Sequence, residues 1–133
     1  MASQAHQKLL NSLAKSMEDF GITITHLDLD GTPELFDEKY RKLSAPKERD
    51  GYKPDLEGMK GVLRHLGEAK IKIKDDENLA SQFRAFTNLE MNGKEIPLHI
   101  AVPKSLKKDL EKMLYKLDLY IKYKKGTIKI WAE

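Results

Sequence analysis

Apolar residues recur at helical spacing in several stretches of the chain. Residues 4–20 place leucines, a methionine and a phenylalanine on one face, which predicts an amphipathic helix capped by Ser3 and ended by Gly21. Residues 104–117 repeat this period and give the strongest helix prediction. The expected helices cover residues 4–20, 32–43, 55–66, 76–86 and 104–117.

Other stretches alternate apolar and polar residues, which is typical of half-buried strands. In the first of them the inward-facing parity shifts between Ile24 and Leu27, which implies either a bulge near Thr25–His26 or burial on both faces. Asn92-Gly93 lies between extended segments and favours a two-residue hairpin turn. The expected strands cover residues 22–30 and 69–73, with hairpins over 88–102 and 119–131.

This order of elements predicts one α+β domain over residues 1–133. We expect a mixed sheet of about six strands with about five helices packed on it, because helices separate the early strands while hairpins dominate the later ones. Residues 44–54, with two prolines and a glycine, form the most loop-like stretch and a possible flexible loop. The strand order, and whether the two hairpins share one sheet, stay open.

Composition narrows the class of protein. The chain has 133 residues and no cysteine, which excludes disulfides and thiolate metal sites. No apolar run approaches the ~18 residues of a membrane span, so no membrane partner is expected. There is no basic-then-apolar start typical of a signal peptide, which favours a cytoplasmic protein. Source, oligomeric state and completeness of the chain stay open.

Charge is distributed unevenly along the chain. Residues 104–133 carry nine lysines against four acidic residues, whereas residues 1–103 have a net charge of −2. Basic side chains interleaved with aromatic rings suit an anionic partner with stackable bases. The leading hypothesis is therefore a non-catalytic binding module for nucleic acid or nucleotide, built on the C-terminal helix and hairpin. Its candidate residues are Lys122, Lys124, Lys125, Lys129, Tyr120 and Trp131.

Two tyrosines add a nucleotide-binding alternative. Tyr40 and Tyr52 flank the loop that contains Lys47 and Arg49, and such an arrangement suits a purine ring with its phosphate. The competing interpretation places Tyr40 in the core and makes Tyr52 an anchor of the loop.

The segment ITITHLDLDGTPELF carries the most suggestive motif. An apolar strand followed by Asp-x-Asp-Gly-Thr resembles the first motif of the haloacid dehalogenase superfamily of phosphatases. The resemblance covers about ten residues and implies that Asp28 is a nucleophile and Asp30 an acid/base, with Asp75 and Asp76 completing a magnesium site. The alternative is ordinary Asp-Gly turn chemistry between a strand and a helix.

The remaining candidates do not converge on one chemistry. The four histidines are scattered, and no two lie at the helical spacing of a metal site, so neither a resident metal nor a cofactor is expected. A close competitor to the binding module is a protein–protein interaction or adaptor domain, which would pair through an exposed C-terminal edge strand. Such a domain could be part of a larger protein. The phosphatase is the third hypothesis, and the sequence leans towards a protein that is not an enzyme.

Overall fold

Five strands form one mixed sheet in the computed structural model of the chain, which describes residues 2–74 and 77–133. The strand order is β1-β2-β3-β6-β7, and strands β4 and β5 form a separate small hairpin. The strands are β1 Thr23–Leu27, β2 Leu56–Lys60, β3 Leu63–Ala69, β4 Glu90–Met91, β5 Lys94–Glu95, β6 Leu98–Val102 and β7 Ile128–Ala132. The expected α+β class is confirmed.

The sheet divides into an antiparallel and a parallel half. Strands β1, β2 and β3 run antiparallel to one another in chain order, whereas β6 pairs parallel to β3 and β7 parallel to β6. Each parallel step is bridged by helices, as parallel strands require. The α-helices are α1 Gln4–Asp19, α2 Glu77–Thr87, α3 Lys107–Lys116 and α4 Tyr120–Lys124.

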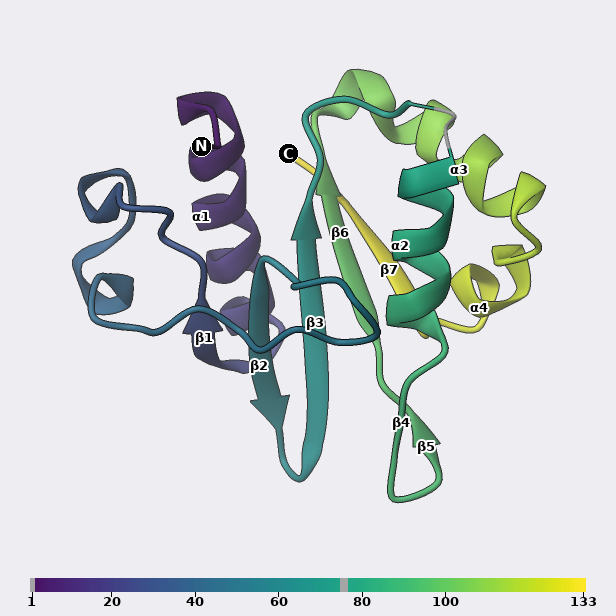
Figure 1. Cartoon of the computed structure of the whole chain (residues 1–133), viewed down its shortest axis with the longest axis horizontal. Coiled ribbons are helices and arrows are strands. Elements are labelled where there is room, and N and C mark those ends of the chain that lie inside the picture. Colours follow the sequence, from purple (N-terminus) through teal and green to yellow (C-terminus); the bar gives the residue numbers. More distant parts are fainter. Residues whose placement is uncertain (1, 75–76) are drawn as a thin grey trace.

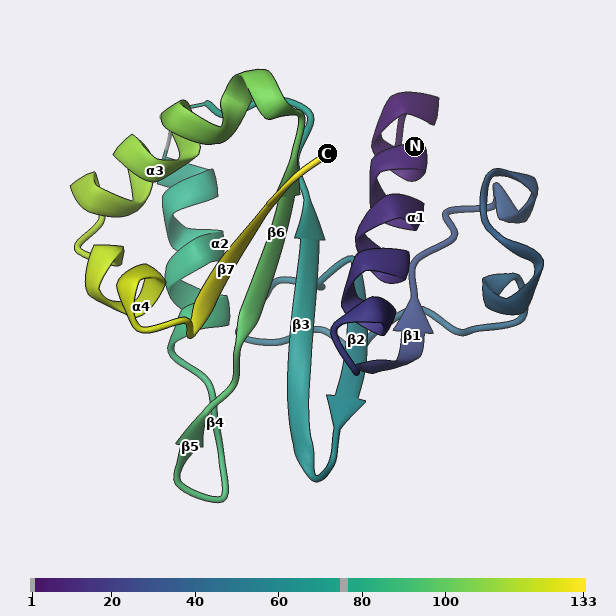
Figure 2. The same cartoon turned by 180° about the vertical axis from the view of Figure 1, so that it is seen from behind.

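Helices cover both faces of the sheet (Figures 1 and 2). Helix α1 packs on one face, where Leu10, Leu13 and Met17 are fully buried against β1 and β2 residues. Helices α2 and α3 pack on the other face, over Ile100 and Ile128 and their neighbours. Strand β6 therefore has buried residues on both faces, which hides the alternation by which strands are normally recognised.

Several sequence predictions are confirmed in detail. Ser3 caps α1 by accepting a hydrogen bond from the His6 amide. The register of β1 against β2 shifts between Ile24 and His26, which is the expected bulge. Asn92 and Gly93 both have positive φ and form the turn between β4 and β5.

The predicted helix over 55–66 is wrong, because these residues form the β2–β3 hairpin. Two glycines weaken a helix there. Gly61 has φ +61° and makes the turn, while Gly58 allows β1 to approach β2. The consequence matters for the site, since the hairpin brings Asp55 beside the end of β3.

Other expected elements differ as well. The strand expected over 69–73 is wrong, because β3 ends at Ala69 and residues 70–74 form no strand. The predicted C-terminal hairpin over 119–131 is wrong: the segment forms helix α4 and then β7, which pairs with β6 instead of with its own neighbour. The helix expected from residue 32 consists of two short 3₁₀ turns, Pro33–Leu35 and Glu38–Tyr40. Asp75 and Asp76, candidate magnesium ligands, lie outside the described residues.

Candidate functional site

Three polar residues meet at the end of two inner strands of the sheet, where β2 begins and β3 ends. Asp55 immediately precedes β2, Glu68 lies near the end of β3, and Lys70 follows that strand. The register Leu56↔Gly67 sets Asp55 and Glu68 side by side although they are far apart in sequence. We call these residues the Asp55–Glu68–Lys70 site.

Backbone hydrogen bonds hold the two carboxylates in place. The Asp55 amide donates to Glu68 Oε1 at 3.0 Å. The Ala69 amide donates to Asp55 Oδ2 at 2.9 Å. Because each side chain is bound by the other's strand, the hairpin register and the carboxylate positions depend on each other.

Glu68 is a buried carboxyl group with only 1% of its surface exposed. Burial, reinforced by the negative charge of Asp55, raises the pKa of Glu68 to about 8. Lys70 Nζ lies 3.3 Å from Glu68 Oε2 and donates to Gln82 Oε1 of α2 at 2.7 Å. Both Glu68 oxygens thus have partners, yet burying a carboxyl group still costs stability, and a buried carboxyl group with a raised pKa is a candidate functional group.

His6 of α1 contacts the Asp55 carboxylate, from the face of the sheet opposite to α2. Its Nε2 lies 3.3 Å from Asp55 Oδ2, and this hydrogen bond raises the pKa of His6 to about 9. At neutral pH His6 is therefore protonated, and burial favours the uncharged form of Glu68.

The arrangement provides oxygen ligands for a hard divalent cation. Magnesium is commonly held by one or two carboxylates, with waters and substrate phosphates completing its shell. Asp55 and Glu68 fit that donor set. Among the described residues, no three His, Cys, Asp or Glu side chains are placed to bind one metal ion together. The structure therefore does not indicate a metal site built from protein ligands alone among those residues.

Sequence reasoning did not identify this site. In the sequence, Asp55 begins the stretch predicted as a helix over 55–66, and Lys70 lies within the strand predicted over 69–73. The useful signal is the pair Pro54-Asp55 followed by Glu68-Ala69-Lys70, with the two acids 13 positions apart. It becomes meaningful only when residues 56–69 are understood as a hairpin.

Asp28, the proposed nucleophile, lies beside this site. It follows β1, its amide donates to the Asp55 carbonyl at 2.9 Å, and its carboxylate lies 3.2 Å from Lys53 Nζ. Asp30 is not directed at the same place: it has φ +47° and accepts a hydrogen bond from the Ala2 amide. The structure therefore brings Asp28, but not Asp30, next to Asp55.

The two tyrosines do not form a common pocket. Tyr40 is buried in the core beneath α1 and donates its hydroxyl proton to Glu18. Tyr52 contacts Phe86 edge-on, over the other face of the sheet. This matches the alternative in which Tyr40 is a core residue and Tyr52 anchors the loop.

The C-terminal lysines have divided roles. Lys122 donates to the Thr87 carbonyl and pairs with Glu95, and Lys125 pairs with the same carboxylate. Lys124 lies over the Tyr120 ring at 5.6 Å.

Lys129 lies elsewhere, on β7, 4.9 Å from the Trp131 ring centre. Trp131 in turn donates its indole proton to His99. The candidate residues of the basic end thus do not converge on a single surface.

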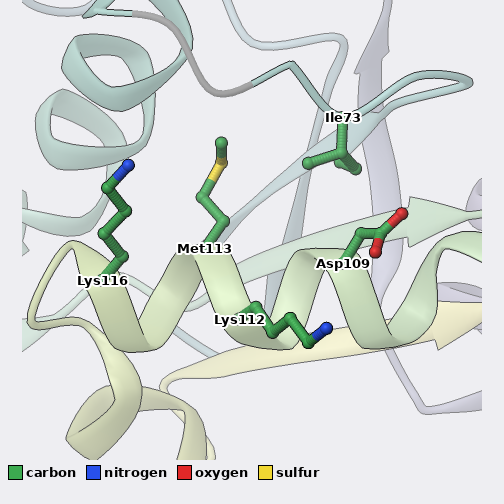
Figure 3. A pocket seen from close by; sticks show the side chains of 5 residues that line it. All are labelled: Ile73, Asp109, Lys112, Met113 and Lys116. Atoms are coloured by element: carbon green, nitrogen blue, oxygen red, sulfur yellow. The ribbon is translucent and has the colours of Figure 1, made fainter.

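A separate pocket of about 240 Å³ lies between α3 and the segment that follows Lys70 (Figure 3). Ile73 and Met113 face each other across it, and Lys112 lies along its helical side. The pocket therefore connects the segment leaving the Asp55–Glu68–Lys70 site with the basic surface of α3.

Comparison of the chain with protein-family models, curated proteins and solved structures gave no significant match. None of the helices in the described part of the chain combines the length and apolar character needed to cross a bilayer. The functional argument therefore depends on the geometry of the site.

Proposed function

We propose that the protein hydrolyses phosphodiester bonds of nucleic acid with the help of a divalent cation, at the Asp55–Glu68–Lys70 site. The observation that carries the proposal is the buried Glu68 carboxyl group, placed beside Asp55 by the hairpin register and beside Lys70 by its own strand. This differs from the non-catalytic binding module that the sequence favours, but it keeps nucleic acid as the partner.

The residues present fit a magnesium ion. Asp55 and Glu68 would hold it, and binding would release the proton that burial keeps on Glu68. A cation bound there supplies Lewis-acid polarisation of a phosphoryl oxygen and activation of water. His6 positions the Asp55 carboxylate through their hydrogen bond.

Lys70 provides the remaining positive charge. It is held between Glu68 and Gln82, so its ammonium group has a fixed position at the end of β3. A fixed cation beside a scissile phosphate stabilises the negative charge that develops there during substitution. Its removal should therefore affect turnover more than substrate binding.

The surroundings support a polyanionic substrate. The segment after the site carries Lys72 and Lys74, both exposed, and leads to the pocket beside α3. Helix α3 adds Lys108 and Lys112, and Tyr115 there is 71% exposed. Lysines with exposed aromatic rings suit a nucleic-acid strand, since each base offers a face for stacking.

The test is cleavage of labelled single- and double-stranded DNA and RNA with Mg²⁺ or Mn²⁺. We expect Glu68→Gln and Lys70→Met to lower cleavage at least about 100-fold, the scale on which one catalytic electrostatic group acts. Glu95→Gln and Lys42→Met, which change the same residue types away from the site, should retain activity.

Metal binding provides a readout independent of turnover. Mg²⁺ or Mn²⁺ should raise the melting temperature of the unaltered protein but not that of Glu68→Gln, because a ligand of the native state stabilises it by mass action. Equal shifts in both proteins, or cleavage that survives Glu68→Gln, would contradict the proposal.

A second candidate is nucleic-acid binding without cleavage, which the exposed tyrosine and lysines of α3 favour. It would be supported if oligonucleotides bind in a salt-sensitive manner but are not cut with either metal ion.

A further inference from the structure

We propose that two copies of the chain associate by antiparallel pairing of their β7 strands. β7 is an edge strand of the sheet, since β6 is its only neighbour among the strands of residues 2–74 and 77–133. This inference is independent of the proposed hydrolytic function. It identifies the protein partner of the edge strand as a second copy of this chain.

The backbone of β7 directs unpaired groups outward. The Leu98 amide donates to the Thr127 carbonyl, and the Glu133 amide donates to the Val102 carbonyl. In a parallel ladder these bonds alternate, so the odd-numbered residues of the segment face β6. The amides and carbonyls of Ile128, Ile130 and Ala132 accordingly face away from the sheet, where a second strand can bind them.

The sequence of β7 complements itself in one register. If Ile130 lies opposite its own copy, Ile128 lies opposite Ala132, and all three outward-facing residues form hydrogen-bonded pairs. In the same register, Lys129 of each chain lies opposite Trp131 of the other chain. Lys129 Nζ already lies 4.9 Å from the Trp131 ring centre within one chain, so cation and ring share a face of the sheet.

The opposite edge of the sheet is protected, which makes the contrast informative. Strand β1 is bulged between Ile24 and His26, and the Leu27 amide donates to the Ser44 carbonyl of the adjacent loop. Bulges and covering loops are the usual protection against edge pairing. β7 is regular over its five residues and contains no proline. A twofold dimer through β7 is also the closed arrangement that homo-oligomers most often adopt.

Cysteine crosslinking tests the register, because the chain has no cysteine of its own. Opposed residues of a hydrogen-bonded antiparallel pair have Cα atoms about 5.5 Å apart, within disulfide range. Ile130→Cys should form a covalent dimer under mild oxidation, whereas Val62→Cys, at a residue 79% exposed in the β2–β3 turn, should not.

Light scattering on the protein without substitutions should give twice the 15.3 kDa chain mass. Ala132→Pro removes an amide that binds nothing within its own chain, so it should yield a folded monomer, while Ala132→Ser stays dimeric. A monomeric native protein at high concentration would overturn the proposal. So would a dimer in which Ile130→Cys crosslinks no better than Val62→Cys.

Discussion

Two buried histidine rings and the partly buried Trp131 form a hydrogen-bonded chain that fixes the histidine protonation states. The Trp131 indole can only donate, so His99 Nδ1 accepts at 2.9 Å. His99 must then carry its proton on Nε2 and donate it to His65 Nδ1, also at 2.9 Å. Neither imidazole can gain a proton at its bonded nitrogen without losing a hydrogen bond. Two of the four histidines, although scattered along the sequence, are thus paired in space as neutral imidazoles.

This arrangement predicts a dependence of stability on acid. Burial, followed by the neighbouring His65 and lysines, lowers the pKa of His99 from 6.5 to about 3. Between these values the unfolded chain binds a proton that the folded chain does not. Stability from this group is therefore complete above pH 6.5 and is lost as pH falls towards 3.

His99→Gln should flatten that dependence, because an amide retains a donor and an acceptor but does not titrate. Each unit of pKa difference corresponds to about 1.4 kcal/mol. The free energy of unfolding should therefore fall about 2–3 kcal/mol further in the unaltered protein than in the variant between neutral pH and pH ~4.5. Denaturant titrations at both pH values measure this, and parallel losses would contradict the pKa assignment.

At the scale of elements, the sequence predicts most helices and turns but not the hairpin that forms the site. Leu56, Met59, Leu63 and Leu66 recur at helical spacing, so periodicity alone favours a helix. In the fold, Leu56 packs under α1 while Leu66 packs under α2 and α3. A strand buried on both faces has no alternation to detect, and the juxtaposition of Asp55 with Glu68 is lost with it.

The hairpin predicted for the C-terminal segment is wrong for a related reason. Its alternating residues resemble two paired strands, but the chain forms α4 and returns as a strand parallel to β6. Parallel pairing depends on residues distant in sequence, which local patterning does not encode. The bulge of β1 and the Asn92-Gly93 turn, by contrast, are local features and were predicted correctly.

The hairpin itself can be tested at Gly58. A Cβ there would lie 2.8 Å from the Thr23 carbonyl oxygen and 2.5 Å from an Ile22 methyl group. Because a backbone atom cannot move aside easily, Gly58→Ala should lower the free energy of unfolding by about 1–3 kcal/mol. Val62→Ala, in the exposed turn, should change it by less than about 0.5 kcal/mol. Equal effects in chemical denaturation would contradict the packing described for β1 and β2.

At the scale of the whole molecule, lysine side chains take part in the fold as well as in the proposed nucleic-acid surface. Lys122 and Lys125 both pair with Glu95, so replacing them with glutamate would bring like charges together and disturb the fold. Loss of binding in such a variant would not separate the two roles. The exposed lysines of α3 offer a clearer test, because Lys108 and Lys112 line a shallow surface beside Tyr115 and Tyr120.

Lys108→Glu combined with Lys112→Glu should weaken nucleic-acid binding, measured by fluorescence anisotropy in the Glu68→Gln background to prevent cleavage. If each lysine contacts one phosphate, the slope of log affinity against log salt should become shallower by roughly 1.4–1.8, the higher value applying to duplex DNA. Lys42→Glu combined with Lys47→Glu makes the same charge change in the connection between β1 and β2. An equal loss in both variants would mean that net charge, not the α3 surface, governs binding. A loss confined to the α3 variant would place the substrate against α3.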